Sequence, residues 1–242
     1  MNQEFVDKFR AGLKNLGIVL TDWQMEQFHQ YYELLIDWNR VMNLTAITEM
    51  DEVIRKHFID SLSLVWAVDD LAERSADVID VGTGAGFPGI PLKIAFPQLR
   101  ITLLDSLNKR IRFLDEVISC LRLKQIVAIH GRAEDYGRDT AHREQYDLCV
   151  SRAVANTATL SEYCLPFVRV GGYFLPYKSG QIDDELIAAK NAVKILGGDL
   201  EKVVRFCLAD TDVERAIVQV RKVRPTSKKY PRKAGLPGKE PL

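Results

Sequence analysis

The sequence predicts an α/β fold: a mostly parallel, doubly wound sheet of seven strands, with a helical lobe before it and an antiparallel hairpin at one edge. Three observations predict this fold. Apolar residues recur at helical spacing through the first seventy positions, short apolar runs alternate with helical stretches from residue 76 onward, and the last two apolar runs are joined by a short polar turn.

The helical lobe is expected over residues 1–72. Apolar side chains from Phe28 to Met42 recur at three- and four-residue spacing. Such a stripe is typical of a helix face that packs inward, so we expect its aromatic members in the core. Thr21 and Gln24 have the spacing of a capping box that opens this helix.

The α/β core is expected over residues 73–223. Five runs rich in β-branched and aliphatic residues alternate with helical stretches, at residues 77–81, 100–104, 126–129, 146–150 and 172–177. Near-continuous apolar runs suit parallel strands covered on both faces. The runs 203–208 and 216–220 lie too close together for a crossover helix, so we expect them to form the edge hairpin around a turn at residues 209–212.

Charge is divided unevenly along the chain. The 33 basic and 33 acidic residues cancel, but residues 221–242 contain eight basic residues and one acidic residue, which leaves a net charge of −7 on the first 220 residues. The total argues against a nucleic-acid partner, whereas its distribution indicates a basic tail that can reach phosphate. Proline and glycine recur over residues 224–242, so this tail is expected to be extended or disordered on its own.

The cysteine pattern excludes some chemistry. The four cysteines are far apart without a C-x-x-C pair, so we expect no metal, and a reduced, cytoplasmic chain is the favoured interpretation. The first residues lack the basic and apolar regions of a secretion signal, and no apolar run approaches the ~20 residues that span a bilayer. We therefore expect neither secretion nor a membrane partner.

The most informative segment is a glycine-rich turn after the first predicted strand, where Asp80 is followed by Gly82, Gly84 and Gly86. Glycines let the backbone turn sharply and approach a ligand, and a following helix N-terminus faces the ligand's anionic part. Residues 84–89 also fit the dinucleotide pattern G-x-G-x-x-G, and a turn that serves only chain geometry is a third reading. An acid two residues before G-x-G-x-G resembles the S-adenosylmethionine motif of Rossmann-like methyltransferases.

Other polar residues are placed for a nucleoside. Asp105 ends the second predicted strand, about 20 residues beyond the glycine turn, where a carboxylate can bind ribose hydroxyls; capping of the next helix is an equal alternative. Glu134 and Asp135 follow the third strand, where methyltransferases of this fold contact adenine. Ser151 and Arg152 follow the fourth strand beside the ligand crevice, although Arg152 has the alternative of pairing with a helix carboxylate.

Two sequence features that other nucleic-acid methyltransferases use are missing, and this narrows the choice of the atom that is methylated. Methylation of an exocyclic amine generally uses an Asn/Asp-Pro-Pro-aromatic turn, but residues 151–154 read Ser-Arg-Ala-Val. Methylation at C5 of cytosine needs a cysteine nucleophile, whereas Cys149 lies inside a predicted strand and is interpreted as a small buried residue. A ring nitrogen such as guanine N7 carries its own lone pair, so positioning it in line with the sulfonium methyl can suffice.

Several segments together resemble one family: residues 38–39, 43–45, 57–62, 80–89, 151–153 and 232–242. Over nearly its whole length the chain resembles the bacterial 16S ribosomal RNA guanine-N7 methyltransferases of the methyltransferase G family, also called glucose-inhibited division protein B. The resemblance implies a class I methyltransferase that methylates N7 of a guanine in the decoding-region loop of 16S rRNA. It also implies that the cofactor site is lined by Gly82, Phe87, Ala133, Glu134 and Arg152.

Catalysis on this interpretation is direct displacement without an identified general base. Arg152 and Lys178 are candidates for positioning the base or a phosphate. His57 lies on a helical apolar stripe and is favoured as a hydrogen-bonded structural residue, with contact to substrate as the alternative.

The RNA contact is expected in the tail. Arginine and lysine neutralise phosphates, while Tyr230 is expected to stack on a base; the basic candidates are Lys228, Lys229, Arg232, Lys233 and Lys239. A solubilising tail is the alternative. Removal of the residues after Val223 is expected to leave cofactor binding intact while weakening RNA binding and its salt dependence.

The sequence therefore predicts an enzyme that transfers methyl from S-adenosylmethionine to 16S rRNA, either free or in the small ribosomal subunit, with a monomer favoured. Two other functions stay open: a non-catalytic RNA-binding factor for ribosome assembly, which would hold the same cofactor as a structural ligand, and an NAD-dependent oxidoreductase. Label carried from methyl-labelled S-adenosylmethionine into RNA would distinguish them.

Overall fold

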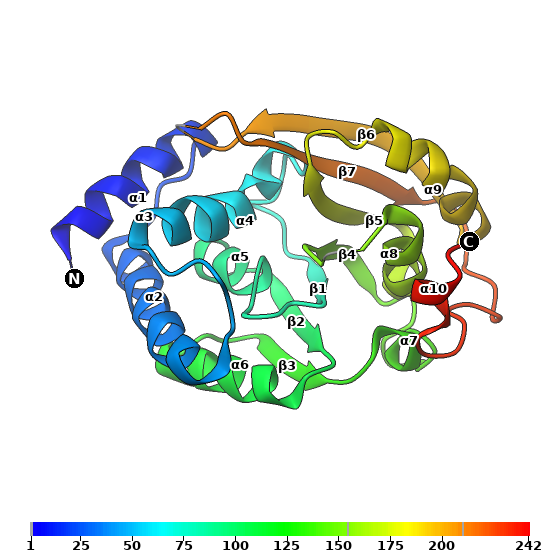
Figure 1. Ribbon diagram of the computed structural model, residues 1–242, viewed down its shortest axis with the longest axis horizontal. Coiled ribbons are helices and arrows are strands. Elements are labelled where there is room, and N and C mark those ends of the chain that lie inside the picture. The colour runs from blue at the N-terminus through cyan, green and yellow to red at the C-terminus, as the bar shows by residue number, and fades with distance from the viewer. Residues whose placement is uncertain (1, 154, 210) are drawn as a thin grey trace.

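The structure, a computed structural model, describes residues 2–153, 155–209 and 211–242; Val154 and Asp210, which belong to two of the predicted turns, lie outside the described residues. A seven-stranded sheet in the order β3-β2-β1-β4-β5-β7-β6 forms its centre (Figure 1). The strands are β1 (Asp77–Val81), β2 (Arg100–Asp105), β3 (Ile126–His130), β4 (Tyr146–Ser151), β5 (Val168–Ser179), β6 (Gly198–Cys207) and β7 (Glu214–Lys222).

The strand directions confirm the predicted sheet. β1 to β5 are parallel, whereas β7 is antiparallel to both β5 and β6. The hairpin therefore joins the sheet through its second strand and leaves β6 at the edge. Helices follow the parallel strands: α5 (Gly89–Ala95), α6 (Asn108–Cys120), α7 (Ala133–Tyr136), α8 (Thr157–Cys164) and α9 (Asp183–Ile195).

Two strands, β5 and β6, begin well before the apolar runs predicted for them. β5 begins at Val168, because Gly171 adopts a φ of 89° and the pairing with β4 shifts from Tyr146–Val168 to Leu148–Tyr173 across that irregularity. Paired glycines in sequence indicate a turn, and here they form a bulge within one strand. β6 begins at Gly198, and its polar first half is tolerated because an edge strand exposes one side to water.

The N-terminal segment is helical, as predicted. Its elements are α1 (Gln3–Leu16), α2 (Asp22–Met42), α3 (Met50–Val53), a π-helical turn (Ile54–Ile59), α4 (Asp60–Leu62) and a 3₁₀ turn (Ser63–Trp66). The capping box at the start of α2 is confirmed, since Thr21 accepts the Gln24 backbone N–H and the Gln24 side chain reaches back to Thr21.

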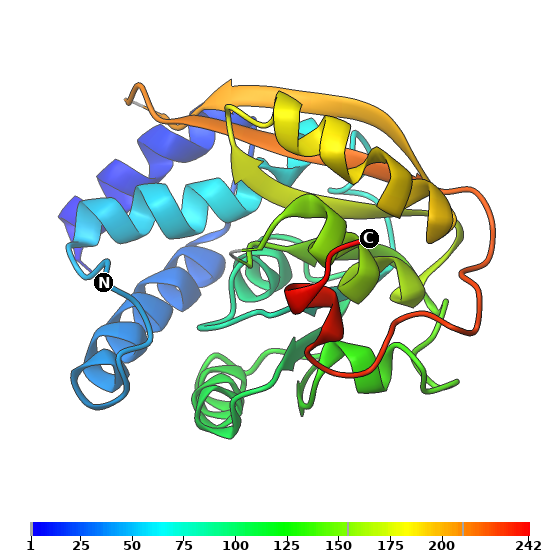
Figure 2. The same cartoon turned by 45° about the vertical axis from the view of Figure 1, so that its right-hand side comes forward.

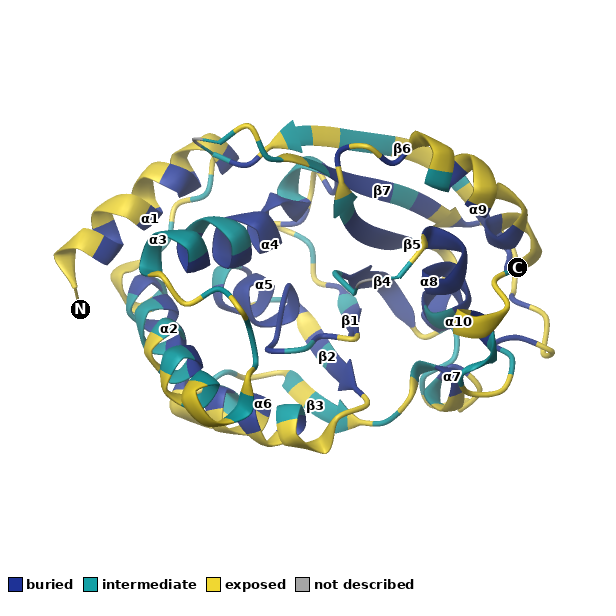
Figure 3. Cartoon of the chain, in the orientation of Figure 1, coloured by how far each residue is buried: buried dark blue, intermediate teal, exposed yellow. Residues whose placement is uncertain are grey.

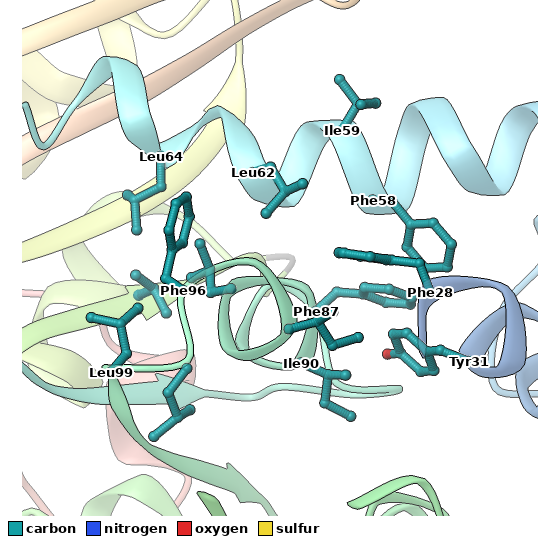
Figure 4. Packing of buried hydrophobic residues seen from close by; sticks show 14 of the residues in the cluster. Phe28, Tyr31, Phe58, Ile59, Leu62, Leu64, Phe87, Ile90, Phe96 and Leu99 are labelled. Atoms are coloured by element: carbon teal, nitrogen blue, oxygen red, sulfur yellow. The ribbon is translucent and has the colours of Figure 1, made fainter. Parts of the chain in front are cut away.

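An aromatic cluster joins these helices to the sheet (Figure 4). The rings of Phe28 and Phe58 have centroids 5.1 Å apart, and Tyr31 lies 5.5 Å from Phe58 and 5.4 Å from Phe87 in the glycine turn. Such edge and offset contacts stabilise beyond the area they bury. One hydrophobic core thus runs from α1 and α2 through α5 to one face of the sheet.

The other face of the sheet has its own core, which the C-terminal tail helps to cover. Cys149 and Phe174 pack there with α8 and α9, and Tyr230 of the tail joins them. β4 and α8 are buried along nearly their whole lengths and β5 in its middle part (Figure 3). The tail leaves β7, crosses beside α7 and α8, and includes a short α10 (Leu236–Lys239) (Figure 2). It is therefore packed on the core in the folded chain, whereas the prediction of an extended or disordered segment concerned the tail on its own.

Candidate cofactor site

A pocket of about 890 Å³ opens at the carboxyl ends of β1, β2 and β4. Ligands of open α/β sheets bind at this edge, and small-molecule sites commonly measure about 300–1,000 Å³. Six of the nine predicted cofactor residues line it: Gly82, Gly84, Asp105, Ala133, Glu134 and Arg152.

The glycine turn forms one side of the pocket. Gly82 has a φ of 73°, and a Cβ built on it would lie 3.3 Å from the Cβ of Ala153, so only glycine leaves the strand end open there. Asp105 holds this turn from β2, because its Oδ2 accepts the Gly84 N–H at 2.9 Å. The N-cap of α6 is Leu107, so the capping role considered for Asp105 is not the one observed.

Three other predicted cofactor residues lie behind the pocket rather than among its described lining residues. Asp80 Oδ2 accepts the Thr83 hydroxyl at 2.6 Å and the Gly89 N–H at 2.9 Å, and burial raises the Asp80 pKa to about 7. Gly86 packs so tightly that a Cβ would lie 2.5 Å from Ile90. The structure thus gives Asp80 and Gly86 the role of shaping the turn, where cofactor contact was expected.

Phe87, the third of these residues, is buried between the turn and the N-terminal helices. Its ring stacks on His57 with centroids 4.4 Å apart, and the Arg152 guanidinium lies 5.7 Å from its centroid. Phe87 therefore packs between His57 and Arg152, and its contact with the cofactor stays a prediction. A strand pattern cannot reveal the stacking on His57, because that residue comes from a segment before the first strand.

Arg152 connects the pocket to the N-terminal helices. Its guanidinium donates to the carbonyl oxygens of Lys56 and His57, at 2.9 and 3.2 Å, and to the Ser61 hydroxyl at 3.1 Å. It also pairs with the buried Asp60 carboxylate at 3.2 Å. The pairing of Arg152 with a helix carboxylate is confirmed. Arg152 also lines the pocket, and its contact with cofactor or substrate stays a prediction.

His57 has the surroundings of a structural residue. It is 8% exposed, and its Nε2 lies 2.9 Å from the Thr45 hydroxyl. Burial and the nearby Arg152 charge lower the His57 pKa to about 3, so the ring is neutral at physiological pH. A neutral, stacked imidazole supports the structural role favoured from the sequence.

Lys178 supports the loop after β4 and is not among the described residues that line the pocket. Its Nζ donates to the Ala155 carbonyl at 2.5 Å and pairs with Glu185 at 2.7 Å. The same Glu185 oxygen accepts the N–H and hydroxyl of Thr157, both at 2.5 Å. Lys178 and Glu185 thus form a network that holds Ala155, which lines the pocket, and Thr157. The contact of Lys178 with base or phosphate stays a prediction.

The predicted RNA residues divide into two groups. Lys228, Lys229, Lys233 and Lys239 are exposed. Tyr230, by contrast, is 7% exposed in the second core, and Arg232 forms an ion pair with the buried Glu162 at 2.6 Å. The stacking role expected for Tyr230 and the phosphate contact expected for Arg232 are therefore corrected: both side chains are committed to the protein itself.

Sequence reasoning missed several pocket residues, including Arg110, Thr159 and Tyr163, and two glycines of the tail, Gly235 and Gly238. The helical residues carry no motif of their own. The tail glycines lie within the family-like ending, but nothing in their spacing indicates which strand end they approach. Within the described residues no group of His, Cys, Asp and Glu side chains could hold a metal ion, and none of the helices described is both long and apolar enough to cross a membrane.

The glycine cradle, the Asp105 carboxylate and the pocket's size fit a nucleoside with a flexible charged arm, and the fold has known counterparts. A variant of the 16S rRNA (adenine(1408)-N(1))-methyltransferase from Catenulisporales acidiphilia, solved with its cosubstrate SAM, matches 66% of this chain and 90% of its own at a TM-score of 0.52 and 13% identity. M. jannaschii TYW2 in complex with AdoMet matches 64% of this chain and 74% of its own at a TM-score of 0.50 and 16% identity.

Fold and site together define a class I, Rossmann-like methyltransferase with S-adenosylmethionine as its cofactor. The family model of rRNA small subunit methyltransferase G matches residues 24–218. Proteins named ribosomal RNA small subunit methyltransferase G are 56% identical over 234 residues in Lachnoclostridium phytofermentans, covering 97% of this chain and 96% of the relative, and 49% identical over 237 residues in Leuconostoc citreum, covering 98% and 99%. The chain belongs to this family.

Proposed function

We propose that this enzyme transfers a methyl group to N7 of a guanine in the decoding-region loop of 16S rRNA. The family and the names of the relatives support ribosomal RNA of the small subunit as the substrate. We propose further that it acts as a monomer, and in the cytoplasm because its substrate is ribosomal RNA.

One observation supports the choice of N7. The described residues that line the pocket include no His, Lys or Cys, and the two carboxylates among them, Asp105 and Glu134, accept the Gly84 and Gly235 N–H groups and are the groups expected to bind the nucleoside. Cys149 is fully buried, and burial raises its thiol pKa well above the ordinary value, so it is not a thiolate nucleophile. An acceptor that needs neither a base nor a covalent adduct fits this pocket best, and guanine N7 is such an acceptor.

When bound, S-adenosylmethionine would supply a methyl group activated by its sulfonium sulfur. Guanine N7 would accept that methyl with its own lone pair, the electron pair of the broken carbon–sulfur bond would stay on sulfur, and no proton would have to leave. Asp105 and the glycine turn would hold the nucleoside, and the carbonyl oxygens of Lys56 and His57 keep Arg152 fixed at the pocket.

The test uses methyl-labelled S-adenosylmethionine with free 16S rRNA in one arm and small ribosomal subunits in the other. Reduction and aniline cleavage at 7-methylguanine then locate the label. We expect a single labelled guanine in the decoding-region loop in at least one arm. Label on another base, or a folded protein that labels neither RNA, would contradict the proposal and favour the non-catalytic RNA-binding factor.

A further inference from the structure

We propose that the C-terminal tail completes the cofactor pocket, and that Arg232 and Glu162 are the positioning pair that holds it there. The inference rests on the S-adenosylmethionine site described above and adds a role to the tail, whose expected function was RNA contact alone.

Two residues of the tail lie in the wall of the cofactor pocket. Gly235 and Gly238 form part of the wall. The Gly235 N–H donates to Glu134 Oε1 at 2.8 Å, and Glu134, 6% exposed, lines the same pocket from α7. On the α8 side, the Thr159 hydroxyl donates to the Pro237 carbonyl at 3.1 Å. The tail is thus bonded to both helices that flank this end of the pocket.

A buried ion pair anchors the tail just before the wall. Arg232 Nε and Nη2 donate to the Glu162 carboxylate at 2.9 and 2.6 Å, and the Arg232 backbone N–H adds a bond of 2.7 Å to the same group. Bidentate pairs of this kind fix geometry as well as contributing energy. Arg232 Nη2 also donates to the Glu240 carbonyl at 2.7 Å, so one guanidinium ties both ends of the segment that carries Gly235 and Gly238.

The consequence reverses one expectation from the sequence. Removal of the residues after Val223 was expected to spare cofactor binding, but that change removes a wall of the pocket and the partner of Glu134. Because the docked tail forms part of the wall, cofactor that binds against this wall and the docked tail stabilise each other by linkage. The exposed Lys233 and Lys239 flank the wall in the sequence.

The test measures the dissociation constant of S-adenosylmethionine by calorimetry, on the full chain and without RNA. Arg232→Ala removes the anchor. Gly235→Pro leaves the anchor but removes the N–H that meets Glu134 and cannot adopt the observed φ of 81°. Arg100→Ala is the matched control, because it deletes a bidentate pair with Asp77 at the opposite ends of the strands.

We expect at least tenfold weaker binding in both tail variants and a change within twofold in the control. Circular dichroism and thermal melts establish which variants are folded. If Arg232→Ala does not fold, the cofactor affinity of Gly235→Pro tests the inference. Unchanged affinity in a folded Gly235→Pro protein, or equal weakening in Arg100→Ala, would overturn the inference. A chain that binds the cofactor in this way and yet labels no RNA would contradict the proposed function and leave this inference standing.

Discussion

At the scale of single residues, Arg152 is the point where the N-terminal helices meet the cofactor pocket. Its two terminal nitrogens donate hydrogen bonds to the carbonyl oxygens of Lys56 and His57, and its Nη2 lies 3.2 Å from Asp60 Oδ2. The π-helical turn supplies both carbonyls, and such turns are often found at functional sites.

Arg152→Lys is expected to lower kcat/KM for RNA methylation at least tenfold, because one ammonium cannot replace a planar guanidinium with several fixed acceptors. Steady-state kinetics of label transfer measure this effect. Arg205→Ala, which removes an exposed pair with Asp183 away from the pocket, is the control and should retain activity within twofold. Full activity of Arg152→Lys would show that the bond geometry is dispensable.

His57 makes stability depend on pH in a predictable direction. Its pKa falls from 6.5 to about 3 on folding. Below pH 6.5 the unfolded chain therefore binds a proton at His57 that the folded chain does not bind, so the free energy of unfolding decreases as pH falls below 6.5. Asp80 acts in the opposite sense, since its pKa rises from 3.8 to about 7 and stability is gained as pH falls through that range.

The difference between wild type and His57→Gln isolates the histidine, because the Asp80 contribution is common to both. Between pH 6.5 and 4.5 we expect the free energy of unfolding of wild type to fall by about 2 kcal/mol relative to the variant. Urea denaturation across that range measures it. A constant difference would mean that His57 titrates normally in the folded chain.

Residue roles were predictable only in part. Asp105 could be placed from strand and spacing, because the carboxyl ends of neighbouring parallel strands share one edge. Asp80, Gly86 and Phe87 belong to the same motif but face Thr83, Ile90 and His57. Which member of a turn faces the ligand depends on the side chains packed behind it, and His57 arrives from a distant helix that no local spacing reveals.

At the scale of elements, the tail shows how the core orders a segment that has little regular structure. Its composition predicted an extended or disordered segment on its own; in the folded chain, Tyr230 lies in the second core and Arg143 donates to the carbonyl oxygens of Thr226 and Tyr230 at 2.7 and 2.9 Å. Hydrogen bonds from Arg143 of the core thus satisfy carbonyl oxygens of a tail backbone that has little regular secondary structure. Composition describes the segment alone and omits the surface that receives it.

Tyr230→Ala is therefore expected to destabilise the protein by about 3 kcal/mol, the order found when a large buried ring is truncated. Tyr230→Phe keeps the ring and should be nearly neutral. Chemical denaturation of both variants checks this. Loss of RNA affinity in Tyr230→Ala at unchanged stability would instead restore the stacking role.

At the scale of the whole molecule, the two hydrophobic cores run through the predicted boundaries. One includes α1, α2 and the sheet, and the other includes the sheet and Tyr230. We propose that the lobe at residues 1–72, the core at 73–223 and the tail at 224–242 fold as one unit. The parallel direction of β1 to β5 was predictable, because these strands alternate with crossover helices. The shared cores were not predictable, since they join segments far apart in sequence.

Charge distribution belongs to the same scale. The four exposed tail lysines, Lys228, Lys229, Lys233 and Lys239, are the residues left for phosphate. Replacing all four with alanine should reduce the slope of log affinity against log salt by about 3, given ~0.7 per phosphate contact with single-stranded RNA. A salt titration of RNA binding measures the slope, and an unchanged slope would place the RNA contact elsewhere.

The central claim concerns the atom that is methylated. The most direct measurement compares small-subunit RNA or subunits containing guanosine at the labelled position with the same substrate containing 7-deazaguanosine, in which a carbon–hydrogen group replaces N7. We expect label transfer to the first and none to the second, with RNA binding preserved. Equal labelling of the 7-deaza substrate would contradict the account, because no lone pair would be present where the reaction is proposed to occur.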